Sequence, residues 1–176
     1  MSARSAWPLV LAAAAFGTAA LALAPARPAG SVRPSQDQAA AAKKVVVPAD
    51  AAWVDTGLDV QAGDTLVFLA AGEINLQRGN PQAVCGPGGL DLVIGGQPVP
   101  DANVGALIGK VSQPVARRVD EDSGAEVLDE IFVLFLVGPE NYLTVPVKGR
   151  LFLGVNENVV KDNEGAFTVV VDRRPA

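Results

Sequence analysis

The chain changes character at about Val45, where short apolar runs begin to alternate with turn residues. Val45 to Val47 is ended by Pro48, and the dense apolar run Thr65 to Ala71 is ended by Gly72. Proline and glycine at these positions are typical of strand ends and turns. The pattern predicts short strands at 45–47, 52–56, 58–60, 65–71, 105–111, 126–137, 142–147, 150–155 and 166–171.

The segment 126–137 could be read as a helix or as a strand. Ile131, Val133 and Phe135 place a β-branched or aromatic side chain at every second position, and Gly138-Pro139 ends the run. This alternation favours a strand. About eight or nine short strands without a convincing amphipathic helix predict an all-β fold, an antiparallel β-sandwich or jelly roll. The predicted core residues are Trp53, Leu66, Phe68, Leu107, Phe132, Phe135, Phe152, Val155, Phe167 and Val169.

The N-terminus has the pattern of an export signal. Arg4 precedes an uncharged stretch rich in Ala and Leu, Trp7 to Ala24. Ala22-Leu23-Ala24 or Ala24-Pro25-Ala26 offers small residues for cleavage, and the second is preferred. An uncleaved membrane anchor is the alternative, because the stretch is at the lower limit of bilayer-spanning length. We therefore expect a secreted or periplasmic protein, with membrane attachment if the segment is retained.

The predicted domain organisation has four parts. Residues 1–26 are the signal peptide or anchor, 27–44 a flexible linker, 45–172 the β-sandwich, and 173–176 a C-terminal tail. The linker is rich in proline, alanine and polar residues, which bury too little apolar area to offset the entropy of ordering.

Composition narrows the function classes. The 14 basic and 19 acidic residues give a net charge of -5, which does not favour nucleic acid as a partner. The absence of histidine excludes His-based catalytic triads and His-ligated metals. The single cysteine, Cys85, excludes an internal disulfide and is expected to be a buried apolar residue or an intermolecular link. No nucleophile elbow, phosphate loop or HExxH motif is present, so we do not expect an enzyme.

Two stretches gather side-chain oxygens. Between the last two predicted strands lie Asn156, Glu157, Asn158, Asp162, Asn163 and Glu164. Calcium takes about six to eight such oxygen ligands, whereas the alternative is an ordinary solvated turn. A second acidic cluster runs from Asp120 to Glu126, with Asp129 and Glu130 behind it. It could hold calcium, but such runs are more often solvated loops.

Three blocks of the sequence resemble the bacterial galactophilic (PA-I type) lectins, which are calcium-dependent galactose-binding jelly rolls. The blocks are Gly63 to Gly72 followed by Cys85 to Gly89, Gly105 to Val111, and Gly149 to Val169 with its Asn156-Glu157 and Asp162-Asn163 pairs. Their order and spacing agree over about Val45 to Asp172.

The resemblance implies a calcium ion that also binds two sugar hydroxyls. Its implied ligands are Asn156, Glu157, Asp162, Asn163 and the backbone carbonyl near Leu76. The sugar would contact Glu157, Asp162 and Asn163, together with Val160, Gln97 and Asp101. The chain departs from the family by having Glu157 where aspartate is usual, no aromatic residue at Leu76, and Gln97 and Asp101 only roughly at the positions of the outer sugar contacts.

The resulting hypothesis is an exported carbohydrate-binding module with calcium as its cofactor and a glycan as its partner. Related lectins form multimers, so the resemblance also implies a possible homo-oligomer. The alternative is a structural or protein-interaction module that has the lectin fold and has lost the sugar and calcium site.

Overall fold

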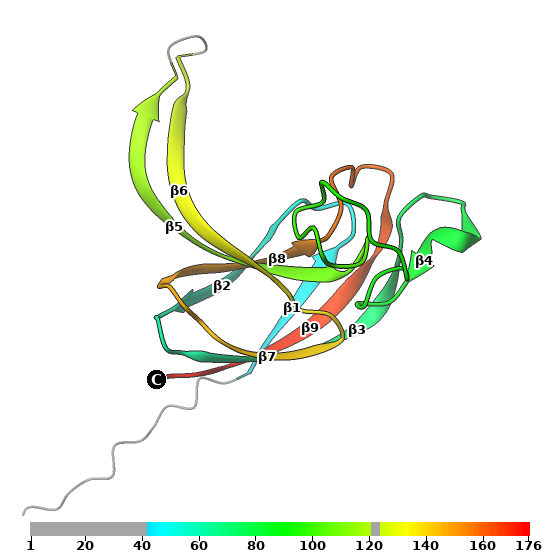
Figure 1. Ribbon diagram of the computed structural model, residues 1–176, viewed down its shortest axis with the longest axis horizontal. Coiled ribbons are helices and arrows are strands. Elements are labelled where there is room, and N and C mark those ends of the chain that lie inside the picture. The colour runs from blue at the N-terminus through cyan, green and yellow to red at the C-terminus, as the bar shows by residue number, and fades with distance from the viewer. Residues whose placement is uncertain (1–41, 121–123) are drawn as a thin grey trace, which may run out of the picture. The chain divides into compact units, whose positions relative to one another are not determined.

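The computed structural model describes residues 42–120 and 124–176. The predicted signal peptide, most of the linker and the centre of the second acidic cluster lie outside these ranges. Within them no helix is long and apolar enough to cross a bilayer. The fold is all-β and consists of two antiparallel sheets (Figure 1).

The first sheet has five strands. Its order is β1 (Lys43–Pro48), β9 (Glu164–Arg174), β3 (Thr65–Asn75) and β4 (Val84–Cys85), and β7 (Glu140–Thr144) also pairs with β3. The ladder between β3 and β9 runs from Thr65↔Arg174 to Asn75↔Glu164. A 3-10 turn, η1 (Pro81–Ala83), precedes β4.

The second sheet has four strands in the order β2 (Val54–Val60), β8 (Gly149–Val155), β5 (Leu107–Val119) and β6 (Glu126–Leu136). A register shift between Asp55 and Leu58 interrupts the β2–β8 ladder, and Gly57 there has a φ of 71°. The β5–β6 hairpin extends well beyond the rest of the sheet (Figure 1).

The core lies between the two sheets. Six of the ten predicted core residues are buried there: Leu66, Phe68, Leu107, Val155, Phe167 and Val169. Phe135 is half-buried and packs against this core, with its ring centroid 6.0 Å from that of Phe68. Burying each such large apolar side chain stabilises the domain by about 1.5–3 kcal/mol.

Three core predictions were wrong. Phe132 is 52% exposed. Side chains alternate between the two faces of a strand, so Phe132 and Phe135, three residues apart, point to opposite faces, and Phe135 is the one that faces the core. Phe152 lies between the buried Leu151 and Leu153 and therefore points to the outer face of the second sheet. Trp53 packs over Gly154 and is half-buried.

These three aromatic residues surround one cation on the outer face. The Lys110 Nζ lies 5.0, 5.8 and 5.1 Å from the ring centroids of Trp53, Phe132 and Phe152 and also forms an ion pair of 3.1 Å with Glu130. Cation–π contacts of this kind explain how Lys110 can be mostly shielded from water.

The later residues of the second acidic cluster lie in a strand, the one predicted at 126–137. In this strand, β6, Glu126, Asp129 and Glu130 form ion pairs with Arg117, Arg118 and Lys110. Residues 121–123 lie outside the described residues.

Candidate functional site

Three loops meet beside the end of β8 (Figure 1). The loop at 156–163 joins β8 to β9. The amide of Arg78, in the segment after β3, donates to the carbonyl of Asp162 at 2.9 Å. The Asn158 side chain donates to the carbonyl of Gly96 at 2.7 Å, in the segment before β5. The fold therefore brings the predicted oxygen-rich loop against the segment that contains Leu76.

The position of this loop depends on close backbone contact at the start of β9. Gly165 has a φ of 91°, and a Cβ atom there would lie 2.6 Å from the carbonyl oxygen of Glu73. Only glycine adopts this conformation without strain and tolerates the approach. Gly165 thus fixes where the loop ends relative to β3.

Asn163 lies at the centre of the candidate site. Its side chain is 1% exposed, and its Nδ2 donates to the Glu157 Oε2 at 2.7 Å and to the carbonyl of Ala49 at 3.1 Å. Its Oδ1 is buried and has no hydrogen-bond partner among the described residues. An unpaired buried acceptor costs about 1–3 kcal/mol, and a bound cation would remove that cost.

Glu157 supplies a carboxylate beside this unpaired oxygen. The side chain is half-buried, and burial raises its pKa above the ordinary value. The hydrogen bond from Asn163 lowers the pKa, and the negative charge of Asp162 raises it again. Desolvation and a like charge both disfavour the ionised carboxylate, so a cation bound here would stabilise it.

Two further predicted calcium ligands, Asp162 and the backbone carbonyl near Leu76, belong to segments that differ in exposure. Asp162 is exposed, and its carboxylate is near enough to influence the pKa of Glu157. Leu76 is buried and its amide donates to the carbonyl of Ala83 at 2.9 Å. A Cβ atom at Gly105 would lie 2.7 Å from the Leu76 side chain, so Leu76 packs closely against Gly105.

Asn156 has a structural role that the sequence did not indicate. It is fully buried, and its Oδ1 accepts a hydrogen bond from the amide of Val99 at 2.9 Å. Its Nδ2 donates to the carbonyls of Val99, Ala102 and Asn103 at 3.0–3.2 Å. The side chain therefore holds the segment before β5, more than 50 residues away in sequence, rather than pointing its amide at Glu157.

The predicted sugar contacts lie on neighbouring segments. Val160 accepts a hydrogen bond from the amide of Asn163 at 3.2 Å and closes the turn. Gln97 is half-buried, and its Oε1 has no partner among the described residues. Asp101 is exposed in the segment that Asn156 holds. Gln97 thus adds a second unpaired oxygen to this group of loops.

Cys85 is buried and free, which confirms the expectation of a small buried side chain. Burial raises the pKa of its thiol to about 11, and the nearby negative charge of Glu157 contributes to the same shift. The thiol is therefore protonated at neutral pH.

The side-chain atoms near Asn163 are oxygen donors, which suit a hard cation better than a softer metal. Among residues 42–120 and 124–176, no three His, Cys, Asp or Glu side chains gather closely enough to hold a metal ion. A cation here would depend on the Glu157 carboxylate, amide oxygens and backbone carbonyls. Such oxygen ligands suit a hard cation.

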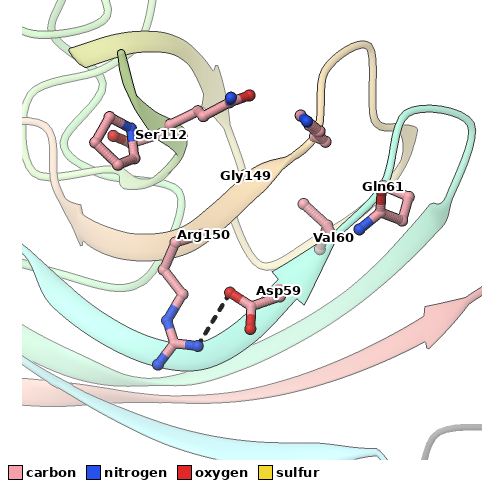
Figure 2. Close-up of a pocket in the computed structure, with 9 residues that line it drawn as sticks. Asp59, Val60, Gln61, Ser112, Gly149 and Arg150 are labelled. Atoms are coloured by element: carbon pink, nitrogen blue, oxygen red, sulfur yellow. Dashed lines mark hydrogen bonds and ion pairs between the residues drawn. The ribbon is translucent and has the colours of Figure 1, made fainter. Parts of the chain in front are cut away.

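A separate groove of about 310 Å³ opens near the start of β8, and Asp59, Val60, Gln61, Ser112 and Arg150 line part of it (Figure 2). The Arg150 guanidinium forms ion pairs of 2.7 Å with Asp55 and 3.1 Å with Asp59. Its charge is thereby neutralised, and the groove contains none of the predicted site residues.

No protein-family model matches the chain, and no curated protein matches it in sequence. Among solved structures, it is similar to the N-terminal domain of EclA, which is described as a PllA-like lectin. The TM-score is 0.51 at 21% identity, over 75% of this chain and 96% of that chain. The fold resembles that of this lectin domain. The predicted resemblance to bacterial lectins is therefore confirmed at the level of the fold.

Proposed function

We propose that this protein is an exported carbohydrate-binding module in which the 156–163 loop holds calcium and binds a galactose-like diol through it. The observation that carries the proposal is the buried, unpaired Asn163 Oδ1 beside the half-buried Glu157 carboxylate. The lectin fold supports the assignment in general terms.

Each residue has a distinct role in this proposal. Glu157 supplies the charge, Asn163 supplies an amide oxygen and orients Glu157, and Asp162 supplies a second carboxylate from the exposed side. Bound calcium would offer open coordination positions to two sugar hydroxyls. Gln97 would contact an outer hydroxyl in this proposal, which its unpaired oxygen in the adjoining segment supports.

A protein-interaction module with the same fold is the alternative function. It is favoured by Val159, an apolar side chain that is exposed in the same loop. In this case the loop would contact an apolar protein surface, and neither calcium nor sugar would be required.

Thermal melts with EDTA and with added calcium test the first step. At a hundredfold excess over Kd, calcium that binds the folded state adds about 2.7 kcal/mol, a Tm increase on the order of 5–10 °C. Glu157→Gln should remove this increase, whereas Glu164→Gln, an exposed residue outside the proposed ligand set, should retain it.

Calorimetry with methyl galactoside and other monosaccharides tests the second step. Heat that depends on calcium supports the lectin proposal. A calcium-dependent Tm increase without heat for any sugar would leave a calcium-binding structural module. No response to either ligand would reject the lectin proposal in favour of the protein-interaction module.

A further inference from the structure

The β6 strand is a long open edge of the second sheet. Within the described residues, β6 is paired with β5 on one side only, and β8 accompanies β5 only as far as Ser112. Beyond this point β5 and β6 form a two-stranded arm that projects from the sandwich (Figure 1). A two-stranded hairpin is at best marginally stable in water, so an additional strand would stabilise the arm.

The arm carries apolar side chains that its own fold leaves in water. Ile131 and Phe132 are 54% and 52% exposed and, as consecutive strand residues, point to opposite faces. Val115 and Val119 on β5 are also exposed. A strand added along β6 would bury apolar surface on both faces at once.

The other sheet edges are short or protected, and the free side of β5 beyond Ser112 carries Pro114 and the bulge between Pro114 and Ala116. Among the described strands, β1 has six residues and begins with two lysines, β7 has five and β4 has two. The β2 edge carries Asp55 and Asp59 and is interrupted at Gly57. Charges, bulges and short length are the usual means by which edges avoid pairing. The eleven-residue β6 contains no proline or lysine, and every one of its residues pairs in sequence with β5, since the only bulge in this ladder lies on β5.

The acidic residues of β6 do not protect it either, because each has a basic partner within the molecule. Glu126 lies 3.7 Å from Arg117, Asp129 lies 3.0 Å from Arg118, and Glu130 lies 3.1 Å from Lys110. These pairs offset the negative charge that would otherwise repel a second strand.

We propose that two copies of this chain pair antiparallel along β6, about a two-fold axis at Ile131. This register aligns all eleven residues, and it places Glu126 opposite Leu136, Asp129 opposite Val133 and Glu130 opposite Phe132 of the other copy. Every acidic residue therefore faces an apolar one. A register centred on Leu128 would instead place Glu126 opposite Glu130, and like charges directly opposite are destabilising.

One contact limits the length of the ladder. The Asn141 side chain donates to the carbonyl of Leu136 at 2.6 Å, so the paired segment would run from Val127 to Phe135. That segment is still centred on Ile131. Because the same strand contributes both halves, the contact closes into a dimer rather than growing into a filament.

Sedimentation velocity of the full chain tests the proposal. The wild-type protein should sediment as a dimer at micromolar concentration, and Ile131→Lys should convert it to a monomer, because two ammonium groups would face each other. Leu69→Lys is the matched control, since Leu69 is 56% exposed on β3 and should not affect the dimer. A monomeric wild-type protein, or a dimer that survives Ile131→Lys, would overturn the proposal.

Disulfide trapping tests the register without relying on the folding of Ile131→Lys. In Ile131→Cys the two introduced residues would be directly opposite, with Cα atoms about 4.5–5.5 Å apart, within the range of a disulfide. In Val127→Cys they would be about 26 Å apart along the paired strands. Cys85 is buried and can remain in both variants. Crosslinked dimers from Ile131→Cys alone are expected, and equal crosslinking of the two variants, or none, would contradict the register.

Discussion

Asn163 donates a hydrogen bond of 2.7 Å to the carboxylate of Glu157 while its own side-chain oxygen is buried without a partner among the described residues. The Asn163 amide nitrogen and the Glu157 carboxylate thus have hydrogen-bond partners, whereas the Asn163 amide oxygen has none among the described residues. A cation that bridges the free oxygen and the carboxylate would complete both groups, and this relationship underlies the first two predictions.

Glu157→Gln should abolish the calcium response without lowering stability in EDTA. The glutamine oxygen can still accept the hydrogen bond from Asn163, and the neutral side chain avoids the desolvation that raises the Glu157 pKa. Chemical denaturation in EDTA should give an unfolding free energy equal to or above that of the wild type. A clear loss of stability in EDTA would show that the Glu157 charge has a partner within the fold.

Calcium binding should weaken in mildly acidic solution. Burial raises the pKa of Glu157 above its ordinary value of 4.5, so the carboxylate becomes protonated at a higher pH than an exposed glutamate. Below the folded-state pKa, apparent affinity should fall by about tenfold per pH unit for this single group. Calorimetric titrations from neutral to acidic pH measure this, and an affinity independent of pH down to the ordinary pKa would contradict it.

The calcium-free protein should show the opposite trend. Between the ordinary pKa and the raised folded-state pKa, the folded protein binds more protons at Glu157 than the unfolded chain does. The contribution of this group to stability therefore decreases as pH rises through that window. The unfolding free energy, measured in EDTA across this pH window, should decrease with pH in the wild-type protein relative to Glu157→Gln.

Strand alternation explains which parts of the fold could be predicted. The runs around Phe68, Leu107, Leu151 and Phe167 have one face in the core, and their pattern predicted strands correctly. The arm was underestimated because it is exposed on both faces, so Gln113 to Arg118 has no apolar alternation to extend the strand past Val111. The β6 strand itself was predicted, whereas the ion pairs of its acidic residues with basic residues of β5 depend on the pairing of the two strands.

The candidate site was predictable only in part. Glu157, Asp162 and Asn163 are close in sequence, so a single loop brings them together. The role of Asn156 depends on carbonyls more than 50 residues away, which no local pattern indicates. The unpaired oxygens of Asn163 and Gln97 are likewise properties of the folded packing.

The two phenylalanines of β6 should respond differently to truncation. Phe135 packs against Phe68, and its ring lies over Gly109, so Phe135→Ala should cost about 3 kcal/mol. Phe132 is 52% exposed, so Phe132→Ala should cost about 1 kcal/mol or less. Urea unfolding of both variants, analysed below the concentration at which any dimer forms, measures the difference. Equal losses would contradict the inward placement of Phe135.

Asn156→Ala should destabilise the protein by about 3 kcal/mol, since it leaves the Val99 amide and several carbonyls without their buried partner. Asn158→Ala is the control, because Asn158 is exposed and makes one hydrogen bond to Gly96. It should cost less than about 1 kcal/mol. Hydrogen exchange of the Val99 amide should accelerate in Asn156→Ala and remain near wild type in Asn158→Ala.

Asp64 and Arg173 join the β2–β3 turn to β9 at the other end of the sandwich. The Asp64 carboxylate is buried and accepts from the Arg173 guanidinium at 2.6 Å and from the Gln61 amide at 2.8 Å. Burial alone would raise the pKa of Asp64, but the hydrogen bonds to its carboxylate and the positive charge of Arg173 together hold the pKa below its ordinary value. The stabilisation is therefore complete above the ordinary pKa and is lost as pH falls through the lower folded-state value.

Arg173→Ala removes one partner and leaves a buried carboxylate, at a cost of about 2–3 kcal/mol after allowance for the partial exposure of Arg173. Arg174→Ala, which breaks an exposed pair with Asp172, should change stability by less than about 0.5 kcal/mol. The difference between wild type and Arg173→Ala should shrink as pH falls through the titration of Asp64, because protonation removes the charge that Arg173 stabilises. Unfolding free energies measured at neutral and acidic pH test this, and a difference that stays constant would assign the effect to packing of the arginine side chain instead.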